Sequence, residues 1–199
     1  MSFSTQKGIT LIELIVAVSV LSFALAGPMT LAASSLRATQ DARNELIATH
    51  LAEEGLEVLH NIRDNNSSND LTPGPGYTGW QNHRIDFVTP CANLGCIVDV
   101  TAHATLPWGV GAIVACTNMD CVGENILYYN PTTGLYRQSL GALGGDWQAS
   151  LFTRTVHVVV ISATREIQVT STVTFRSITG ATRSITVSEV FYNWFPPLQ

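Results

Sequence analysis

Two patterns of apolar residues follow one another in the first third of the chain. From Ile9 to Ala33 almost every position is apolar or small, and Glu13 is the only charged residue. From residue 34 to residue 64 the apolar positions are spaced as on one face of a helix, with charged residues between them. The apolar positions are Leu36, Ile47, Leu51, Val58, Leu59 and Ile62, and the polar positions are Arg43, Glu45, Glu53 and Glu57.

These patterns predict one long helix over residues 9–64, roughly 84 Å in length at 1.5 Å per residue. Gly27-Pro28 should kink it, because proline removes a backbone hydrogen bond and contacts the previous turn. Gly55 costs about 1 kcal/mol relative to alanine but need not end the helix. The polar run from Asn65 to Asn69 is the predicted end.

After residue 65 the chain reads as short strands separated by loops. LTPGPGYTGW and GALGGDW are expected loops. Ile126–Tyr129 and Leu135–Gln138 form a hairpin candidate around a turn that contains proline and glycine. The last third alternates apolar and polar positions in three runs joined by turns at Ala163–Arg165 and Thr179–Ala181. The apolar positions of the first run are Val156, Val158 and Val160, with Thr155, His157 and Val159 on the opposite face. Those of the second run are Ile167, Val169, Val173 and Phe175, and the third run contains Arg183, Ile185 and Val187.

Such alternation predicts an antiparallel meander with one half-buried face. The amphipathic half of the helix can cover that face. The expected fold class is therefore α+β: a long N-terminal helix, half apolar and half amphipathic, packed on an antiparallel β-sheet head.

The apolar half of the helix has the length of a membrane span. Twenty-five helical residues reach about 37 Å, and the hydrocarbon core of a bilayer is about 30 Å thick. Only eight residues precede it, with Lys7 as their one basic side chain. The chain is thus expected to be anchored at its N-terminus or exported through a cleaved leader. The net charge of −5 argues against a nucleic-acid-binding surface.

A carboxylate at position 13 is costly in this setting. Insertion scales place the cost of an acidic residue at a membrane helix centre at about 2.5–3.5 kcal/mol. Cleavage after Gly8 would give Ile9 a free ammonium group four residues from Glu13. Two unit charges 4 Å apart attract by about 4 kcal/mol at an effective dielectric of 20. An amine of a neighbouring subunit would serve equally well and would set the axial offset between subunits.

The segment KGITLIELIVAVSVL resembles the N-terminal signature of type IV prepilins and pseudopilins. The resemblance implies cleavage after Gly8 by prepilin peptidase, N-methylation of Ile9, and assembly with other pilin subunits through the apolar helix and Glu13. It implies a prepilin leader at residues 1–8, a transmembrane helix half at 9–33, an amphipathic half at 34–64 and a β-rich head at 65–199. It also implies contact with cytoplasmic membrane lipid, with the head outside the cytoplasm, before entry into an extracellular or periplasmic filament.

Two other interpretations of the N-terminus compete with this one. The segment could be a secretory signal peptide cleaved after Ala24–Ala26, or a plain signal anchor. Glu13 interrupts the apolar region that a signal peptide needs, so the prepilin hypothesis is preferred. The first residue of the mature protein discriminates: methylated Ile9 supports it, whereas Gly27 or Met1 rejects it.

Four cysteines form two C-x4-C pairs, Cys91/Cys96 and Cys116/Cys121. They could hold a tetrathiolate zinc ion, but this spacing lies at the loose end of structural zinc sites. Disulfides suit an exported head better. Gly95 permits the tight turn that a Cys91–Cys96 bond needs. Three connectivities remain open, with the two local pairs favoured.

No catalytic motif is present, so an enzyme is not expected. The histidines (His50, His60, His83, His103 and His157) are scattered and read as surface residues, and the tryptophans (Trp80, Trp108, Trp147 and Trp194) as core or edge residues, with Trp108 also a possible contact tip. Asp99, Asp120 and Glu124 lack the spacing of a calcium loop, and no cofactor is expected. Asn65 and Asn66 each begin a glycosylation tripeptide, a weak signal.

The predicted function is that of a structural subunit, a minor pilin of a type IV pilus-like filament. The long head with its own cysteine-bearing insert favours a minor subunit over a major one. Two alternatives remain: a pseudopilin of a type II secretion-like machine, and an adhesin or DNA-uptake module at a pilus tip. The absence of a basic, aromatic stripe gives DNA binding little support.

Overall fold

A helix of 58 residues, α1 (Leu11–Ser68), forms the first element of the fold. The structure is a computed structural model, and it describes residues 8, 10–68, 79–82, 84–101, 112–138 and 144–193. The chain divides into two units, Met1–Arg43 and Asn44–Gln199, and α1 contributes residues to both. Two short helices, α2 (Gly79–Asn82) and α3 (Thr89–Ala92), and one 3-10 turn, η2 (Met119–Cys121), lie in the second unit.

The continuous α1 confirms the predicted long helix. Pro28 lies inside the helix without ending it. The predicted end at Asp64 is wrong by one turn, since the helix runs on to Ser68. The leader residues 1–7 and Ile9 lie outside the described residues, as do Trp108, Trp194, His83, His103 and most of the two expected loops.

Asn66 explains why the helix continues through its polar run. Its side chain is fully buried, and its Nδ2 donates to the carbonyl oxygens of Trp80 and Ile85 at 3.4 and 3.0 Å. Its Oδ1 accepts from the backbone N–H groups of Arg84 and Ile85 at 3.1 and 3.2 Å. These four bonds tie the last turn of α1 to α2 and to the segment that follows it. The same burial removes Asn66 as a glycosylation acceptor.

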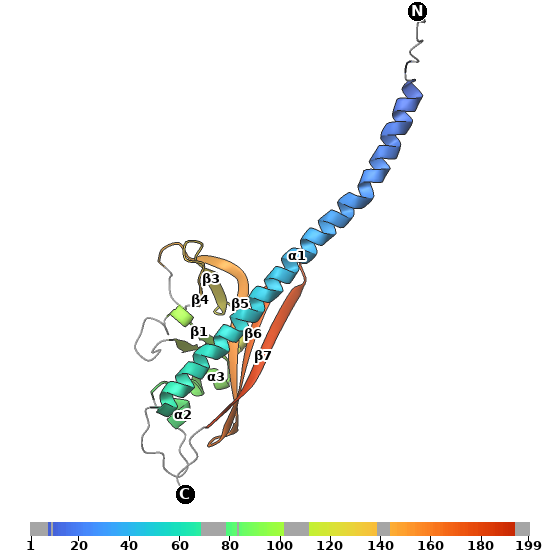
Figure 1. Cartoon of the computed structure of the whole chain (residues 1–199). Coiled ribbons are helices and arrows are strands. Elements are labelled where there is room, and N and C mark those ends of the chain that lie inside the picture. The colour runs from blue at the N-terminus through green and yellow to red at the C-terminus, as the bar shows by residue number, and fades with distance from the viewer. Residues whose placement is uncertain are drawn as a thin grey trace, which may run out of the picture. The chain divides into compact units, whose positions relative to one another are not determined.

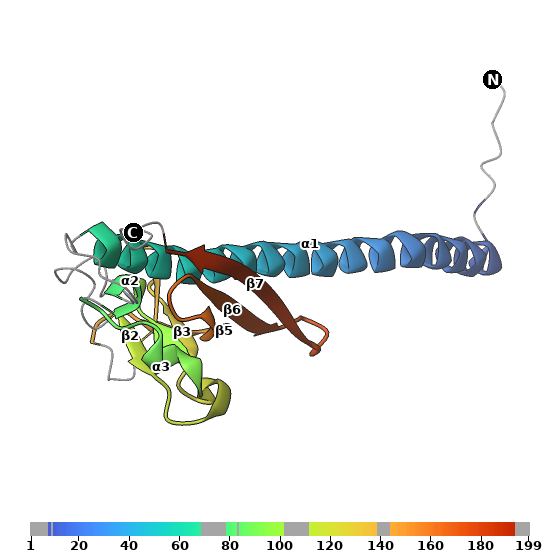
Figure 2. The ribbon, with the colours of Figure 1, turned by 90° about the horizontal axis from the view of Figure 1, so that it is seen from below.

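The second unit holds a seven-stranded antiparallel sheet, which confirms the α+β class. The strands are β1 (Cys96–Val98), β2 (Ile113–Ala115), β3 (Ile126–Tyr129), β4 (Tyr136–Arg137), β5 (Gln148–Ser162), β6 (Glu166–Arg176) and β7 (Thr182–Tyr192). One edge of β5 pairs with β6, which pairs with β7 (Figure 2). The opposite edge of β5 is shared by β3, near residues 148–153, and by β1, at Val156. β4 and β2 then extend the sheet beyond β3 and β1.

The three C-terminal strands form the predicted meander. β6 alternates strictly between buried and half-buried residues, as its sequence pattern requires. β5 departs from the prediction at two positions. Val160 is 43% exposed rather than buried, because it lies near the end of β5 and outside the buried clusters, although it pairs with the buried Ile167. Thr155 is buried, although it was placed on the polar face, because Asn125 and Asp120 pack on it.

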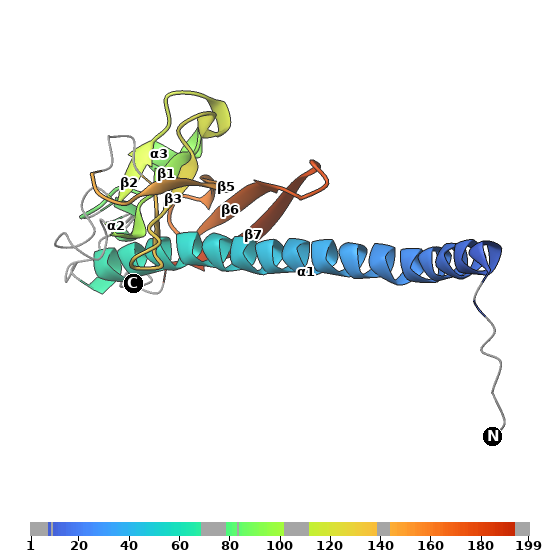
Figure 3. The ribbon, with the colours of Figure 1, turned by 90° about the horizontal axis from the view of Figure 1, so that it is seen from above.

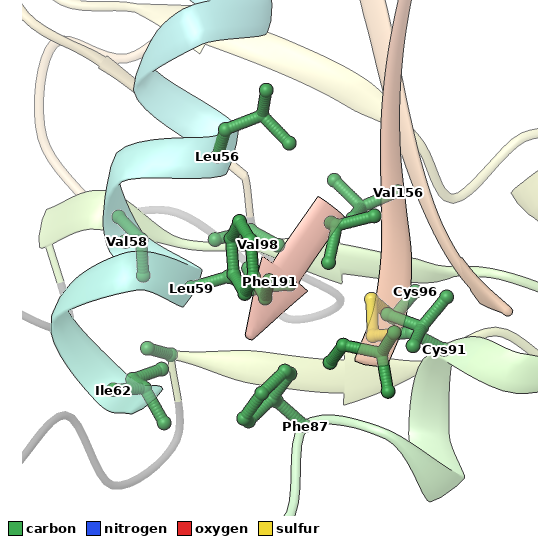
Figure 4. Close-up of a cluster of buried hydrophobic side chains, with 14 of the residues drawn as sticks. Leu56, Val58, Leu59, Ile62, Phe87, Cys91, Cys96, Val98, Val156 and Phe191 are labelled. Carbon is green, nitrogen blue, oxygen red and sulfur yellow. A yellow bond between two sulfur atoms is a disulfide. The ribbon is translucent and has the colours of Figure 1, made fainter. Parts of the chain in front are cut away.

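The C-terminal part of α1 covers one face of this sheet (Figures 1 and 3). Leu56, Val58, Leu59 and Ile62 meet strand residues such as Val156, Val158 and Phe191 in the larger buried cluster (Figure 4). A second cluster joins Ala48, Leu51 and Ala52 to side chains of β3, β5 and β6. The buried face of α1 begins at Ala48, so the prediction that Leu36 belongs to it is wrong: Leu36 is 66% exposed.

Both cysteine pairs form disulfides, Cys91–Cys96 and Cys116–Cys121, and no described cysteine is free. Their Cα atoms are 4.6 and 5.0 Å apart. Gly95 has a φ of +87°, and a Cβ there would lie 2.8 Å from Thr155 Cγ2, so the position requires glycine. The β1–β2 ladder pairs Cys96 with Ala115 and so places the two disulfides next to each other.

Candidate processing and assembly site

The first turn of α1 is capped by the residue that precedes it. Thr10 Oγ1 accepts a hydrogen bond from the backbone N–H of Glu13 at 3.4 Å, and its carbonyl oxygen accepts from the N–H of Leu14 at 3.2 Å. This is half of a T-x-x-E capping box, in which the N-cap hydroxyl binds the N–H three residues on. The signal was present in the sequence as Thr10 and Glu13, but the sequence interpretation did not use it.

Glu13 therefore has a local role as well as the predicted intersubunit one. It is the acidic residue of the first helical turn, and its side chain is exposed. A carboxylate at this position interacts favourably with the positive end of the helix dipole, by about 0.3–1 kcal/mol. Gly8 is exposed as well. The pairing of Glu13 with a new ammonium at Ile9 stays a prediction, since Ile9 lies outside the described residues.

The described part of the first unit presents large exposed apolar side chains. Leu11 is 77% exposed, Phe23 is 82% exposed, and no residue of the most apolar stretch of the helix is buried. Burying one such side chain is worth about 1.5–3 kcal/mol. Among the described residues, α1 is the one helix long and apolar enough to cross a membrane. Its surface requires lipid or other apolar helices as its surroundings.

The hydroxyl groups of this segment are satisfied within the helix. Ser19 donates to the carbonyl of Ile15 and Ser22 to that of Val18, each at 2.8 Å. Thr30 donates in the same way to the carbonyl of Gly27 at 2.8 Å. Since these donors already have acceptors, the hydroxyls add little to the cost of placing the helix in an apolar environment.

In the head, a buried arginine connects the helix to the sheet, and the sequence interpretation missed it. Arg154 is fully buried. Its Nη1 donates to the carbonyl of Leu51 at 2.8 Å and to Glu54 Oε2 at 3.1 Å, both on α1. Its Nη2 donates to the carbonyl of Val98 in β1 at 2.6 Å. Burial lowers the pKa of the Arg154 guanidinium, and the charge of Glu54 opposes that shift.

Gln138 completes this arrangement on the sheet side. It is fully buried, and its Oε1 accepts from Arg154 Nε at 3.1 Å and from the N–H of Val98 at 3.2 Å. Its Nε2 donates to the carbonyls of Arg154 and Asn125 at 2.7 and 2.9 Å. The arginine was detectable in principle, because Arg154 occupies a core-facing position of β5 between Phe152 and Val156.

Gly55 allows the helix to approach this arginine. A Cβ at Gly55 would lie 3.0 Å from Ser171 Oγ and 3.2 Å from Arg154 Cδ. The glycine is thus explained by close contact with the sheet rather than by a break in the helix, which continues through it.

The titratable residues considered as ligands each have a separate partner. Asp99 binds Arg137 at 3.0 Å, and Asp120 binds His157 at 3.1 Å. Glu124 accepts from the hydroxyl and the N–H of Thr117, and these hydrogen bonds lower the pKa of its carboxyl group. In the part of the chain that the structure describes, no three His, Cys, Asp or Glu side chains are grouped to hold a metal ion.

Some of the histidines and tryptophans lie where the sequence predicted, at the surface or in the core, and one does not. His50 lies beside Glu53 on the exposed side of α1 at 3.3 Å. His60 is not a free surface residue, because it binds Glu189 at 2.8 Å and packs on the ring of Phe191. Trp80 is fully buried in the larger cluster, as predicted for a core tryptophan.

Comparison with protein families gives a match at the N-terminus. Residues 3–27 match the family model described as the prokaryotic N-terminal methylation motif. No curated protein and no solved structure matched the chain. The matched range includes Gly8, Ile9 and Glu13, the three residues to which the sequence assigned processing and assembly.

The methylation motif is the signature of type IV prepilins, and this chain carries it. With its apolar N-terminal helix and its antiparallel sheet, the chain has the architecture of a type IV pilin-like subunit. The motif implies processing by prepilin peptidase and assembly with other pilins. Motif and apolar helix together indicate membrane anchoring.

Proposed function

We propose that this protein is a minor subunit of a type IV pilus-like filament and that its role is structural rather than enzymatic. Prepilin peptidase would cut after Gly8, and Ile9 would become the N-methylated first residue of the mature chain. The head would lie outside the cytoplasm while the apolar helix waits in the cytoplasmic membrane. The helix would then leave the lipid for the core of the filament.

One observation carries this proposal: the exposed apolar surface of α1 begins in the helical turn that contains the carboxylate of Glu13. Lipid alone would cover the apolar side chains, but it offers nothing to the Glu13 carboxylate. The ammonium of a neighbouring subunit would offset the cost of that carboxylate inside a bundle of apolar helices. Because Glu13 lies in the first turn, the pairing would fix the axial position of each helix relative to the next.

The first test replaces Glu13 by alanine in the full-length chain. We expect Glu13→Ala protein to remain in the membrane fraction, because its helix becomes more apolar, and to be at least tenfold depleted from sheared filaments. Glu57→Ala is a matched control, since Glu57 is also an exposed glutamate of α1. Quantitative immunoblots of membranes and sheared filaments measure both proteins. Equal amounts of Glu13→Ala and Glu57→Ala protein in the filaments would contradict the assembly role.

A second measurement tests processing separately. The intact mass of the mature protein should correspond to a chain that begins at Ile9, carries one methyl group and contains two disulfides. A mature chain that begins at Met1 or Gly27 would reject the proposal.

The surface location of the filament separates a pilus from a secretion machine. Electron microscopy with an antibody to the head should label long filaments sheared from the cell surface. Label confined to the cell envelope would favour the pseudopilin alternative instead.

A further inference from the structure

A groove lined by polar side chains and their methyl groups lies on the face of the sheet opposite the C-terminal part of α1. It has a volume of about 360 Å³, within the range of small-molecule sites. Its floor is made by threonines of β5 and β6, and its wall by Asp120, in the loop that the Cys116–Cys121 disulfide closes, and by Val122 and Asn125 after that loop. The lining residues are Asp120, Val122, Asn125, Thr153, Thr155, His157, Thr172 and Thr174.

The wall is held rigidly against the floor. Thr155 Oγ1 donates to the carbonyl of Asp120 at 3.0 Å, and Asn125 Nδ2 donates to the same carbonyl at 3.1 Å. Asp120 and Cys121 have positive φ angles of 55° and 56°, which non-glycine residues rarely adopt. One oxygen of Asp120 meets His157 Nε2 at 3.1 Å, and the Asp120 side chain is 69% exposed. The carboxylate therefore keeps acceptor capacity toward the groove.

The floor offers hydroxyl groups at regular intervals. Thr172 pairs with Thr186 at 3.2 Å, and Thr174 pairs with Ser184 at 3.0 Å, each across the β6–β7 ladder. A hydroxyl has one donor hydrogen and two acceptor lone pairs, so each of these groups can make a further hydrogen bond. The threonine methyl groups between them give small apolar patches.

The charge of the lining decides which ligands fit. No lysine or arginine is among the described residues that line the groove, which disfavours phosphates and acidic sugars. Val122 is the one fully apolar side chain among those residues, so the other apolar surface consists of small patches on polar side chains, such as threonine methyl groups, which suit an apolar peptide or a lipid tail poorly. A ligand rich in neutral hydroxyl groups matches the carboxylate, amide, imidazole and hydroxyl groups, and its C–H faces match the methyl groups.

We propose that this groove is a binding site for a neutral saccharide. The Asp120 carboxylate accepts hydrogen bonds from sugar hydroxyls, and the hydroxyl groups of Thr172 and Thr174 bind neighbouring sugar oxygens. The site uses none of the residues of α1, so substitutions in it leave Gly8, Ile9 and Glu13 unchanged.

The test uses the full-length chain, purified in a detergent without a sugar head group. The protein is applied to an array of immobilised oligosaccharides, half neutral and half sialylated or sulfated, and the strongest neutral one is titrated calorimetrically. Thr172→Val removes one hydroxyl and keeps the shape, and it should weaken binding about threefold to tenfold. Asp120→Asn suits the left-handed backbone and should weaken binding at least tenfold.

Thr170→Val is the matched control. Thr170 lies on the same face of β6 and its hydroxyl pairs with Ser188 at 2.9 Å, but it does not line the groove. Binding of a neutral saccharide that Thr170→Val leaves unchanged and the other two variants weaken supports the proposal. It is overturned by retention of acidic sugars alone, by no retention, or by equal effects of Thr170→Val and Thr172→Val.

Discussion

Replacing Arg154 tests whether the buried arginine holds the sheet against the helix. Arg154→Ala removes the hydrogen bonds to Leu51, Val98, Glu54 and Gln138 at once. Glu54 is 38% exposed and can turn to water, and Gln138 Oε1 keeps its bond to the N–H of Val98. The carbonyl oxygen of Val98 would lose its hydrogen bond and could not bind water instead, because Val98 is fully buried.

The expected loss of stability follows from these contacts. An orphaned buried acceptor costs about 1–3 kcal/mol, and truncation of a large buried side chain adds the cost of a cavity. We therefore expect Arg154→Ala to lower the free energy of unfolding of the head by about 3–5 kcal/mol, the combined cost of the orphaned acceptor and the cavity. Arg154→Met fills most of the space and should cost about 1–3 kcal/mol, because it leaves mainly the orphaned acceptor.

The assay is urea unfolding of the full-length, oxidised chain in detergent micelles, followed by tryptophan fluorescence. Arg183→Ala is the control, because Arg183 is half exposed and meets Glu45 at 3.6 Å. That exposed pair should contribute less than about 1 kcal/mol. If Arg154→Ala and Arg183→Ala shift the unfolding midpoint equally, the assignment of a structural role to the buried network is refuted.

Two further substitutions probe the same interface and are measured in the same way. Gly55→Ala gains about 1 kcal/mol of helix propensity but places a Cβ 3.0 Å from Ser171 Oγ. The new Cβ would also lie 3.2 Å from Arg154 Cδ, and Arg154 is held in place by its hydrogen bonds, so we expect a net loss of stability of about 1 kcal/mol. A stabilised variant would show that the helix can shift away from the sheet. Asn66→Ala removes four hydrogen bonds at the end of α1 and should cost about 2–3 kcal/mol. An unchanged midpoint would mean that water replaces the amide.

The parts of the fold that depend on local pattern could be predicted from the sequence. The uninterrupted apolar run predicted the first half of α1, and strict alternation predicted β6 and its turns. Position-by-position alternation was less reliable at the ends of the elements. Val160 continues the apolar pattern of β5 but lies near the strand end, outside the buried clusters, so it is exposed. Where the covering elements stop along a strand depends on the rest of the chain and leaves no mark in the strand's own sequence.

Buried polar residues could not be predicted in this way, because their partners are far away in the sequence. Arg154 and Leu51 are 103 residues apart, and Asn66 meets a backbone 14 to 19 residues later. Asn66 reads locally as a helix stop, whereas in the structure its side chain binds the backbone of Trp80, Arg84 and Ile85 and the helix continues through it. The groove at Asp120 was also missed, since its wall and floor come from separate segments.

The disulfide arrangement has a consequence for the biogenesis of the head. Each bond closes a ring between cysteines only five positions apart, so its contribution through chain entropy is smaller than that of a long-range crosslink. In the unfolded chain a thiolate encounters its nearest neighbour far more often than a distant one. We therefore expect the native bonds to form first during oxidation, so that maturation depends on an oxidant and not on an isomerase.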